Sequence, residues 1–189
     1  MWSGEEFIPR IEALYRAMEV AYDRTATEVG FSCRGCDGTA CCTVDLPLRT
    51  HAEKLVLKRG FAALDQARQR TIIQRSMSVV GLKAESPRGE AYRGAVCVLN
   101  EGGACSLYAH RPMICRLAGV PHNITRPDGK HIYGDGCARF MMDLAPRYPN
   151  VRLDRTAFYQ ELAAVELEMV REDHSRAALE TIAEVLVGA

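Results

Sequence analysis

Eight cysteines in 189 residues are the feature that most constrains this chain. They form two groups and a single residue: Cys33, Cys36, Cys41 and Cys42; Cys97, Cys105 and Cys115; and Cys137. Thiols at this density form disulfides, hold metal ions or iron–sulfur clusters, or carry out thiol redox chemistry. The choice among these uses decides the function of the protein.

A disulfide framework is the first use to weigh, because the number of cysteines is even. Small stapled domains lack a large core, whereas this chain is 48% hydrophobic and long enough to bury one. Its first residues are acidic and contain no apolar signal-peptide core, and no stretch approaches the roughly 18 apolar residues of a membrane span. We therefore expect a cytoplasmic protein outside the membrane, in which reduced thiols ligate metal or act in catalysis.

The charge balance gives no sign of a nucleic-acid partner. The chain has 24 basic and 24 acidic residues, and no segment carries the clustered Lys and Arg of a nucleic-acid footprint. No phosphate-binding glycine loop, nucleophile elbow or H-E-x-x-H motif is present, so the sequence leaves open whether the protein is an enzyme. The expected partner is a metal ion or iron–sulfur cluster, and a protein partner is left open.

Helical periodicity and capping residues indicate the organisation of the chain. The predicted helices are one at about 4–28 stopped by Gly30, a short one opened by the Thr50-x-x-Glu53 capping box and ended by Gly60, one at about 61–80, and a C-terminal helix capped by Asp154 and broken near His174. Helices therefore flank the first cysteine group on both sides.

The stretch between residues 81 and 150 is predicted to be irregular. It holds nine of the fifteen glycines, six of the eight prolines and four cysteines. A short strand is expected at 95–99, with a turn at 100–103 before Cys105. A long irregular stretch in a compact domain needs additional interactions to keep it ordered, and bound metal would provide them. The sequence thus predicts one mainly α domain, 1–189, whose helices flank an irregular, metal-bound, cysteine-rich core with at most a short strand pair.

Cysteine spacing favours a metal site but does not name the metal. The Cys33-x2-Cys36 pair can turn two sulfurs toward one ion, a spacing shared by zinc and iron–sulfur sites. Side chains of adjacent residues on an extended backbone point apart, so Cys41 and Cys42 would serve two centres or a multinuclear one. Eight thiols suffice for two four-cysteine sites, or for one such site and four further cysteines.

The motif Cys33-x2-Cys36-x4-Cys41-Cys42 and a second block resemble the CxxCxxCC cysteine-cluster family, the YkgJ-type zinc- or iron-chelating proteins. The second block matches at Cys97, Cys105, Tyr108, Arg111, Pro112, Cys115 and Arg116. The resemblance covers a module of about residues 30–140, and the spacing between Cys36 and Cys41 is four residues where the family has two. It implies chelation of zinc, iron or an iron–sulfur cluster.

These observations lead to residue roles and to three candidate functions. All eight cysteines are candidate ligands, whereas His110 and His122 are less favoured ones. A zinc ion held by four thiolates carries a charge of about −2, and Arg111 and Arg116 would offset that charge without ligating the metal. The alternative is that these two arginines only pin their loop to a carbonyl or carboxylate.

The leading function is metal or iron–sulfur binding in electron transfer, metal handling or support of a partner enzyme. The alternatives are a metal- or Fe–S-dependent enzyme and a zinc-stabilised interaction module.

Overall fold

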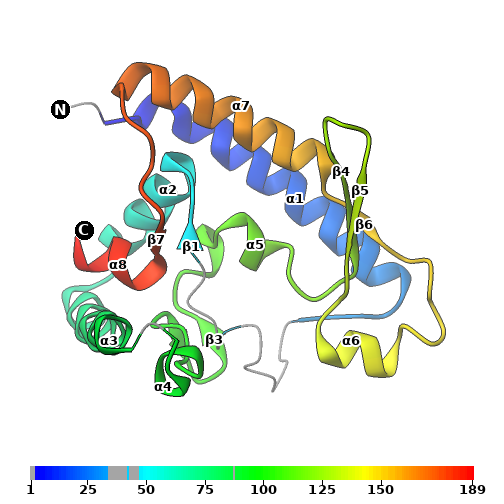
Figure 1. The fold of residues 1–189 in the computed structure, drawn as a ribbon, viewed down its shortest axis with the longest axis horizontal. Helices are drawn as coiled ribbons and strands as arrows, with labels where there is room; N and C mark the ends of the chain where they lie inside the picture. The colour runs from blue at the N-terminus through cyan, green and yellow to red at the C-terminus, as the bar shows by residue number, and fades with distance from the viewer. Residues whose placement is uncertain (1–2, 34–41, 43–46, 87) are drawn as a thin grey trace. The chain divides into compact units, whose positions relative to one another are not determined.

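The computed structural model describes residues 3–33, 42, 47–86 and 88–189 (Figure 1). The chain forms two compact units: unit 1 comprises Met1–Cys36 and Met113–Glu172, and unit 2 comprises Asp37–Pro112 and Asp173–Ala189. The fold is mainly α with short strand pairs, as the sequence predicts. The assignment of the whole chain to a single domain stays a prediction.

Two long helices lie side by side in unit 1 and are joined by ion pairs from Arg10 to Glu161 and Glu168. Helix α1 (Ile8–Glu28) follows a turn of 3-10 helix, η1 (Glu5–Phe7), and α7 (Thr156–Asp173) runs alongside α1 (Figure 1). Both helices bury an apolar stripe, which includes Ile11 and Met18 of α1 and Val165 of α7. The predicted helix at 4–28 and its stop are confirmed, since Gly30 adopts a left-handed φ of 68°.

The other elements of unit 1 are short, and they come after α1 and before α7 along the chain. In order, these are α5 (Met113–Arg116), β4 (His122–Thr125), β5 (His131–Gly134), α6 (Ala138–Asp143) and β6 (Leu153–Asp154). Strand β4 pairs antiparallel with β5 and parallel with β6, a sheet that the sequence analysis did not anticipate. The Asp154 carboxylate accepts a hydrogen bond from the Thr156 backbone N–H at 2.8 Å, which confirms the predicted cap of α7.

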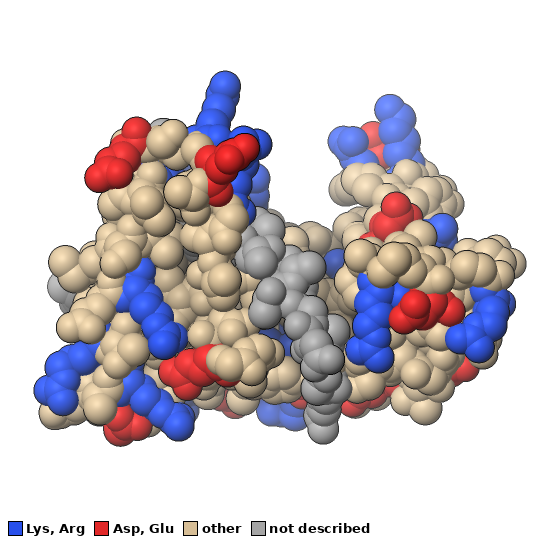
Figure 2. Space-filling view, turned by 90° about the horizontal axis from the view of Figure 1, so that it is seen from below, with Lys and Arg blue, Asp and Glu red and all other residues tan. Residues whose placement is uncertain are grey.

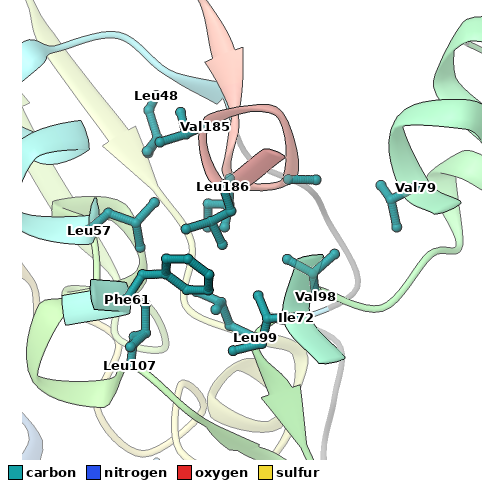
Figure 3. Close-up of a cluster of buried hydrophobic side chains, with 12 residues drawn as sticks. Leu48, Leu57, Phe61, Ile72, Val79, Val98, Leu99, Leu107, Val185 and Leu186 are labelled. Carbon is teal, nitrogen blue, oxygen red and sulfur yellow. The ribbon is translucent and has the colours of Figure 1, made fainter. Parts of the chain in front are cut away.

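Unit 2 is built around a cluster of buried apolar side chains from helices that are distant in sequence (Figure 3). Its elements are β1 (Pro47–Leu48), α2 (His51–Ala62), α3 (Gln66–Glu85), α4 (Glu90–Arg93), β2 (Asn100–Glu101), β3 (Ala104–Cys105), η3 (Tyr108–His110), β7 (Glu180–Thr181) and α8 (Ile182–Val187). Phe61 of α2, Ile72 of α3 and Leu186 of α8 meet in the cluster. Strand β1 pairs antiparallel with β7, which brings α8 back to the first part of the unit.

The predicted end of the second helix at Gly60 is wrong. Helix α2 continues to Ala62, and α3 begins at Gln66 after the cap residue Asp65. A Cβ atom at Gly60 would lie 2.6 Å from Nδ1 of His110, so glycine is needed there for close packing and not for a helix stop. Sequence alone does not distinguish these two uses of glycine.

The short strand predicted at 95–99 is also wrong, although the turn that follows it is correct. Strands β2 and β3 begin after that segment and pair Glu101 with Ala104 across two residues. Gly102 and Gly103 have φ values of 60° and 88°, the left-handed conformation that a two-residue hairpin turn requires. Cys97 therefore lies before the hairpin and not in a strand.

The C-terminal helical segment is broken as predicted. Helix α7 ends at Asp173, and His174 takes a left-handed φ of 55°. Helix α8 then starts with a capping box in which Thr181 and Glu184 exchange hydrogen bonds. The Glu184 carboxylate also accepts hydrogen bonds from Nζ of Lys83 on α3 at 2.8 Å, so one carboxylate caps α8 and ties it to α3.

We predict that Glu184→Gln destabilises unit 2 by about 1 kcal/mol at neutral pH. Burial alone would raise the pKa of Glu184, but the hydrogen bonds from Lys83 and Thr181 outweigh it and bring the pKa below 4.5. The carboxylate therefore stabilises the fold at neutral pH, and this contribution disappears as the pH falls through the lowered pKa. Thermal unfolding of both proteins between pH 7 and pH 3 should show curves that converge in acid. Glu85→Gln, at an exposed site on α3, is the control, and an equal loss there would contradict the prediction.

We predict that Gly60→Ala destabilises the protein by about 1–3 kcal/mol, because the new methyl group overlaps the His110 side chain. In an open helix, Gly→Ala stabilises by up to about 1 kcal/mol. Gly81→Ala on α3, where a Cβ meets nothing within 4 Å, should show that ordinary gain. Denaturant unfolding measures both effects. Gly60→Ala should cost less stability in the His110→Ala background than in the wild type, because Cγ and Nδ1 of His110 are removed while its Cβ, 2.8 Å from the new methyl group, remains. An equal loss in both backgrounds would refute the packing argument.

Candidate metal centre

The structure describes six of the eight cysteines, and none of these six forms a disulfide. Each is partly buried. Cys36 and Cys41 lie outside the described residues. The six described thiols divide evenly between the units: Cys33, Cys115 and Cys137 in unit 1, and Cys42, Cys97 and Cys105 in unit 2.

Cys33 lies just beyond α1, and its sulfur is held by unit 1. The hydroxyl of Tyr22 on α1 donates a hydrogen bond to the Cys33 sulfur at 3.0 Å, and the thiol reaches the Ala118 carbonyl at 3.8 Å. The guanidinium of Arg139 on α6 donates to the Ser32 carbonyl at 3.2 Å, which fixes the backbone before Cys33. A hydroxyl that donates to sulfur favours the thiolate form, which is the form that ligates metal.

Gly119 connects Cys33 with Cys137. It has a φ of 107°, and a Cβ atom there would lie 2.7 Å from the Cys33 sulfur. Its carbonyl accepts a hydrogen bond from the Cys137 backbone N–H at 3.0 Å. Gly136 also approaches closely, since a Cβ there would lie 2.7 Å from the same carbonyl oxygen. Two cysteines from distant parts of the chain thus meet at one glycine.

Cys115 lies in α5, directly before the buried Arg116. The Arg116 guanidinium forms an ion pair with Glu19 of α1 and lies over the Tyr15 ring, 4.3 Å from its centroid. Arg116 is only 3% exposed, so this contact fastens α5 to α1 inside unit 1. The geometry corresponds to the loop-pinning role that the sequence left open beside charge compensation.

A second buried guanidinium, that of Arg155, lies next to the same loop. Arg155 is 5% exposed, and one of its terminal nitrogens donates to the Leu117 carbonyl, two residues before Gly119. Its Nε has no hydrogen-bond partner among the described residues. Burial lowers the pKa of Arg155, because removal from water disfavours its positive charge. An anionic centre nearby would stabilise that charge.

The three described cysteines of unit 2 are joined through their backbones. The Cys97 N–H donates to the Cys42 carbonyl at 2.5 Å, and the Asn100 N–H donates to the Cys97 carbonyl at 2.8 Å. Asn100 pairs with Cys105 in the β2–β3 hairpin. Burial raises the pKa of the Cys105 thiol, and the nearby charge of Cys42 acts in the same direction.

Arg111 is the cation that acts on Cys105. It opposes the rise in the Cys105 pKa, so its charge is close enough to stabilise the thiolate. Its Nε donates to the Tyr108 carbonyl at 2.9 Å, and the guanidinium lies 3.5 Å from the centroid of the Tyr108 ring. Arg111 is therefore anchored on η3, and its positive charge opposes the rise in the pKa of the Cys105 thiol.

The two histidines considered as ligands have different surroundings. His110 packs against Gly60 of α2. His122 is partly buried on β4, and its Nδ1 has no hydrogen-bond partner among the described residues. Burial and the positive charges of Arg155 and Arg152 lower the pKa of His122, which favours the neutral imidazole.

In the part of the chain that the structure describes, no three Cys, His, Asp or Glu side chains come close enough together to hold an ion. The donor set nevertheless fits zinc or iron, since both are bound in proteins by cysteine thiolates. The Tyr22 hydroxyl donates a hydrogen bond to the Cys33 sulfur, as groups that support a metal-bound thiolate do. The cysteines are therefore chemically suited to zinc or iron, although the described sulfurs do not surround a common site.

Sequence reasoning missed Tyr22, Gly119 and Arg155. Tyr22 was one of several apolar positions at helical spacing, with nothing to distinguish it from core residues. Gly119 was one glycine among many in the irregular stretch, and Arg155 lies outside the cysteine module. Gly119 and Arg155 act through contacts between distant segments of the chain, and Tyr22 reaches past the end of its helix to Cys33. Local spacing reveals none of these contacts.

Comparison with known proteins identifies the class of this chain. The family described as "Putative zinc- or iron-chelating domain", CxxCxxCC, matches residues 32–132, which is more than half of the chain. The chain therefore belongs to this family. No curated protein and no solved structure gives a significant match. Cys137 falls beyond the matched residues, and its link to Gly119 is seen only in the structure.

We predict that Tyr22→Phe weakens metal retention by about tenfold, as is typical when a hydrogen bond to a metal ligand is lost. The substitution removes one hydroxyl and leaves the ring in place. Release of metal to a chelator should be faster than in the wild-type protein. Tyr133→Phe, at a 63% exposed site, is the matched control and should behave as wild type. Identical release rates for Tyr22→Phe and wild type would show that the hydroxyl does not support a ligand.

Proposed function

We propose that this protein binds zinc or an iron–sulfur cluster through the thiolates of Cys33, Cys36, Cys41, Cys42, Cys97, Cys105, Cys115 and Cys137. The observation that carries the proposal is the sulfur of Cys33, a residue of the family-matched segment, which accepts a hydrogen bond from a tyrosine hydroxyl beside a close-packed glycine. A sulfur held this way is oriented by its surroundings, as ligand side chains at metal centres are.

The residues around the thiols perform three tasks in this proposal. Tyr22 orients and stabilises the Cys33 thiolate, and Arg111 offsets the charge of Cys105. Arg116 fastens the helix that carries Cys115 to α1. A bound zinc ion would order the irregular segments, whereas an iron–sulfur cluster would add one-electron transfer. The corresponding roles are metal handling for zinc and electron transfer, alone or for a partner enzyme, for a cluster.

The proposed compartment is the cytoplasm, where thiols remain reduced and able to ligate metal. Within the described residues, no helix is long and apolar enough to cross a membrane. Lysine, arginine and acidic side chains are interspersed on the face shown in Figure 2. This mixture supports a protein partner over nucleic acid, which would favour a basic surface.

We predict stoichiometric zinc or iron in protein purified without oxygen, because cysteine thiolates that have not been oxidised bind both metals. Elemental analysis gives the metal, and the absorption spectrum separates the two candidates, since an iron–sulfur protein is brown and a zinc protein is colourless. Cys33→Ser and Cys115→Ser should lose metal, because a hydroxyl is a poor ligand at neutral pH.

The control for these variants is His131→Ala, which removes an exposed side chain on β5. It should retain the metal content of the wild-type protein. Wild-type protein without zinc or iron, or cysteine variants with undiminished metal, would overturn the proposed function.

A further inference from the structure

The Cys33 sulfur contacts both α1 and the loop that follows α5, residues 117–119. From α1, the Tyr22 hydroxyl donates to the sulfur at 3.0 Å. On the loop, the Ala118 carbonyl lies 3.8 Å from the sulfur, and a Cβ atom on Gly119 would lie 2.7 Å from the sulfur and 3.1 Å from the Tyr22 hydroxyl. The position of the sulfur therefore depends on the 117–119 loop as well as on the helix.

Two contacts from later parts of the chain hold the 117–119 loop. The Cys137 backbone N–H donates to the Gly119 carbonyl at 3.0 Å, and a terminal nitrogen of Arg155 donates to the Leu117 carbonyl. Leu117 directly follows the four-residue helix α5, and carbonyls at a helix end lack partners within the helix. A basic side chain can supply the missing donor, and Arg155 does so here.

The backbone of Arg155 is fixed by regular structure on both sides. Its N–H donates to the Asn123 carbonyl of β4 at 2.9 Å, and its carbonyl accepts a hydrogen bond from the Tyr159 N–H of α7 at 3.1 Å. The guanidinium therefore extends to the loop from the junction of a sheet and a long helix. Groups carried by such elements position their targets more precisely than groups on loops.

Packing alone does not explain a buried arginine at this place. Arg155 is 5% exposed, and its Nε has no hydrogen-bond partner among the described residues. Removal from water lowers the pKa of Arg155, and the described groups that oppose this effect are Tyr159 and Tyr22, neither of which is a carboxylate. A buried charge without an acidic partner costs free energy that an apolar side chain would avoid. The donor itself is therefore what the fold uses.

We propose that Arg155 is a positioning residue for the Cys33 ligand: its hydrogen bond to the Leu117 carbonyl holds the 117–119 loop against the Cys33 sulfur. This inference rests on the proposed function, which makes Cys33 a ligand. Arg155 lies beyond the family-matched residues 32–132, so the segment after the matched region takes part in forming the site.

The first test compares Arg155→Met with Tyr22→Phe and with the double variant. Each single change should speed the release of bound metal to a chelator by about tenfold, the usual effect of losing a group that supports a ligand. Because both residues act on one sulfur, the double variant should stay well below the roughly hundredfold effect of independent sites. Arg155→Lys keeps a donor for the Leu117 carbonyl and should restore most of the retention.

The second test reads the loop directly and does not require bound metal. The Cys137 amide is bonded to the Gly119 carbonyl, so its hydrogen exchange reports the position of the loop. In the protein as purified, Arg155→Met should speed exchange of the Cys137 amide by about tenfold and leave the amide of Val165, in the middle of α7, unchanged.

The matched control is Arg152→Met, the same substitution three residues earlier. Arg152 is exposed, and its guanidinium lies 5.3 Å from the centroid of the Tyr133 ring. This variant should match the wild-type protein in both metal release and hydrogen exchange.

The outcomes distinguish the two proposals. Wild-type metal release in Arg155→Met, or a full hundredfold effect in the double variant, would overturn the positioning role and leave metal binding intact. Equal acceleration of exchange at Cys137 and Val165 would also overturn it, since Arg155 would then stabilise unit 1 as a whole. Wild-type protein without zinc or iron would overturn the proposed function, and the ligand role of Cys33 with it, while exchange at Cys137 would still show whether Arg155 holds the loop.

Discussion

The close approach at Gly119 is the contact on which the thiol arrangement of unit 1 depends. A residue with a side chain could not occupy this position without displacing the Cys33 sulfur, and its positive φ is a conformation that other residues rarely adopt. The carbonyl of the same residue holds the backbone of Cys137. Steric space and hydrogen bonding at one residue therefore position both the Cys33 sulfur and the Cys137 backbone. The long helices α1 and α7 supply the rigid frame, and Arg116 joins α5 to that frame.

Much of the helical framework could be predicted from sequence because its signals are local. Thr50 caps α2, Asp154 caps α7, and the left-handed residues Gly30 and His174 mark helix ends. The prediction that Gly60 ends a helix was wrong, because the role of Gly60 is set by its contact with His110, fifty residues further on. The β4–β5–β6 sheet was missed for a related reason, since its strands are short and carry no strong alternation of polar and apolar residues.

The chemistry of the candidate site could be predicted from the sequence, but the spatial arrangement of its residues could not. Residue type and spacing identified the cysteines as candidate ligands, and the family match supports zinc or iron chelation. The supporting groups Tyr22 and Arg155 come from a helix interior and a strand–helix junction, where neither residue forms a motif. Their importance follows from what they contact: a sulfur in one case and a loop carbonyl in the other. Only the tertiary structure contains that information.

The late position of β7 and α8 has a consequence for synthesis of the chain. These elements complete the apolar core of unit 2, and a helix as short as Ile182–Val187 has little stability by itself. During synthesis, the ribosome therefore exposes Cys42, Cys97 and Cys105 long before the residues that complete unit 2 have emerged. During that interval the three thiols belong to an incomplete structure. Oxidation and capture of metal then compete for the nascent chain, and the reducing state of the surroundings decides which comes first.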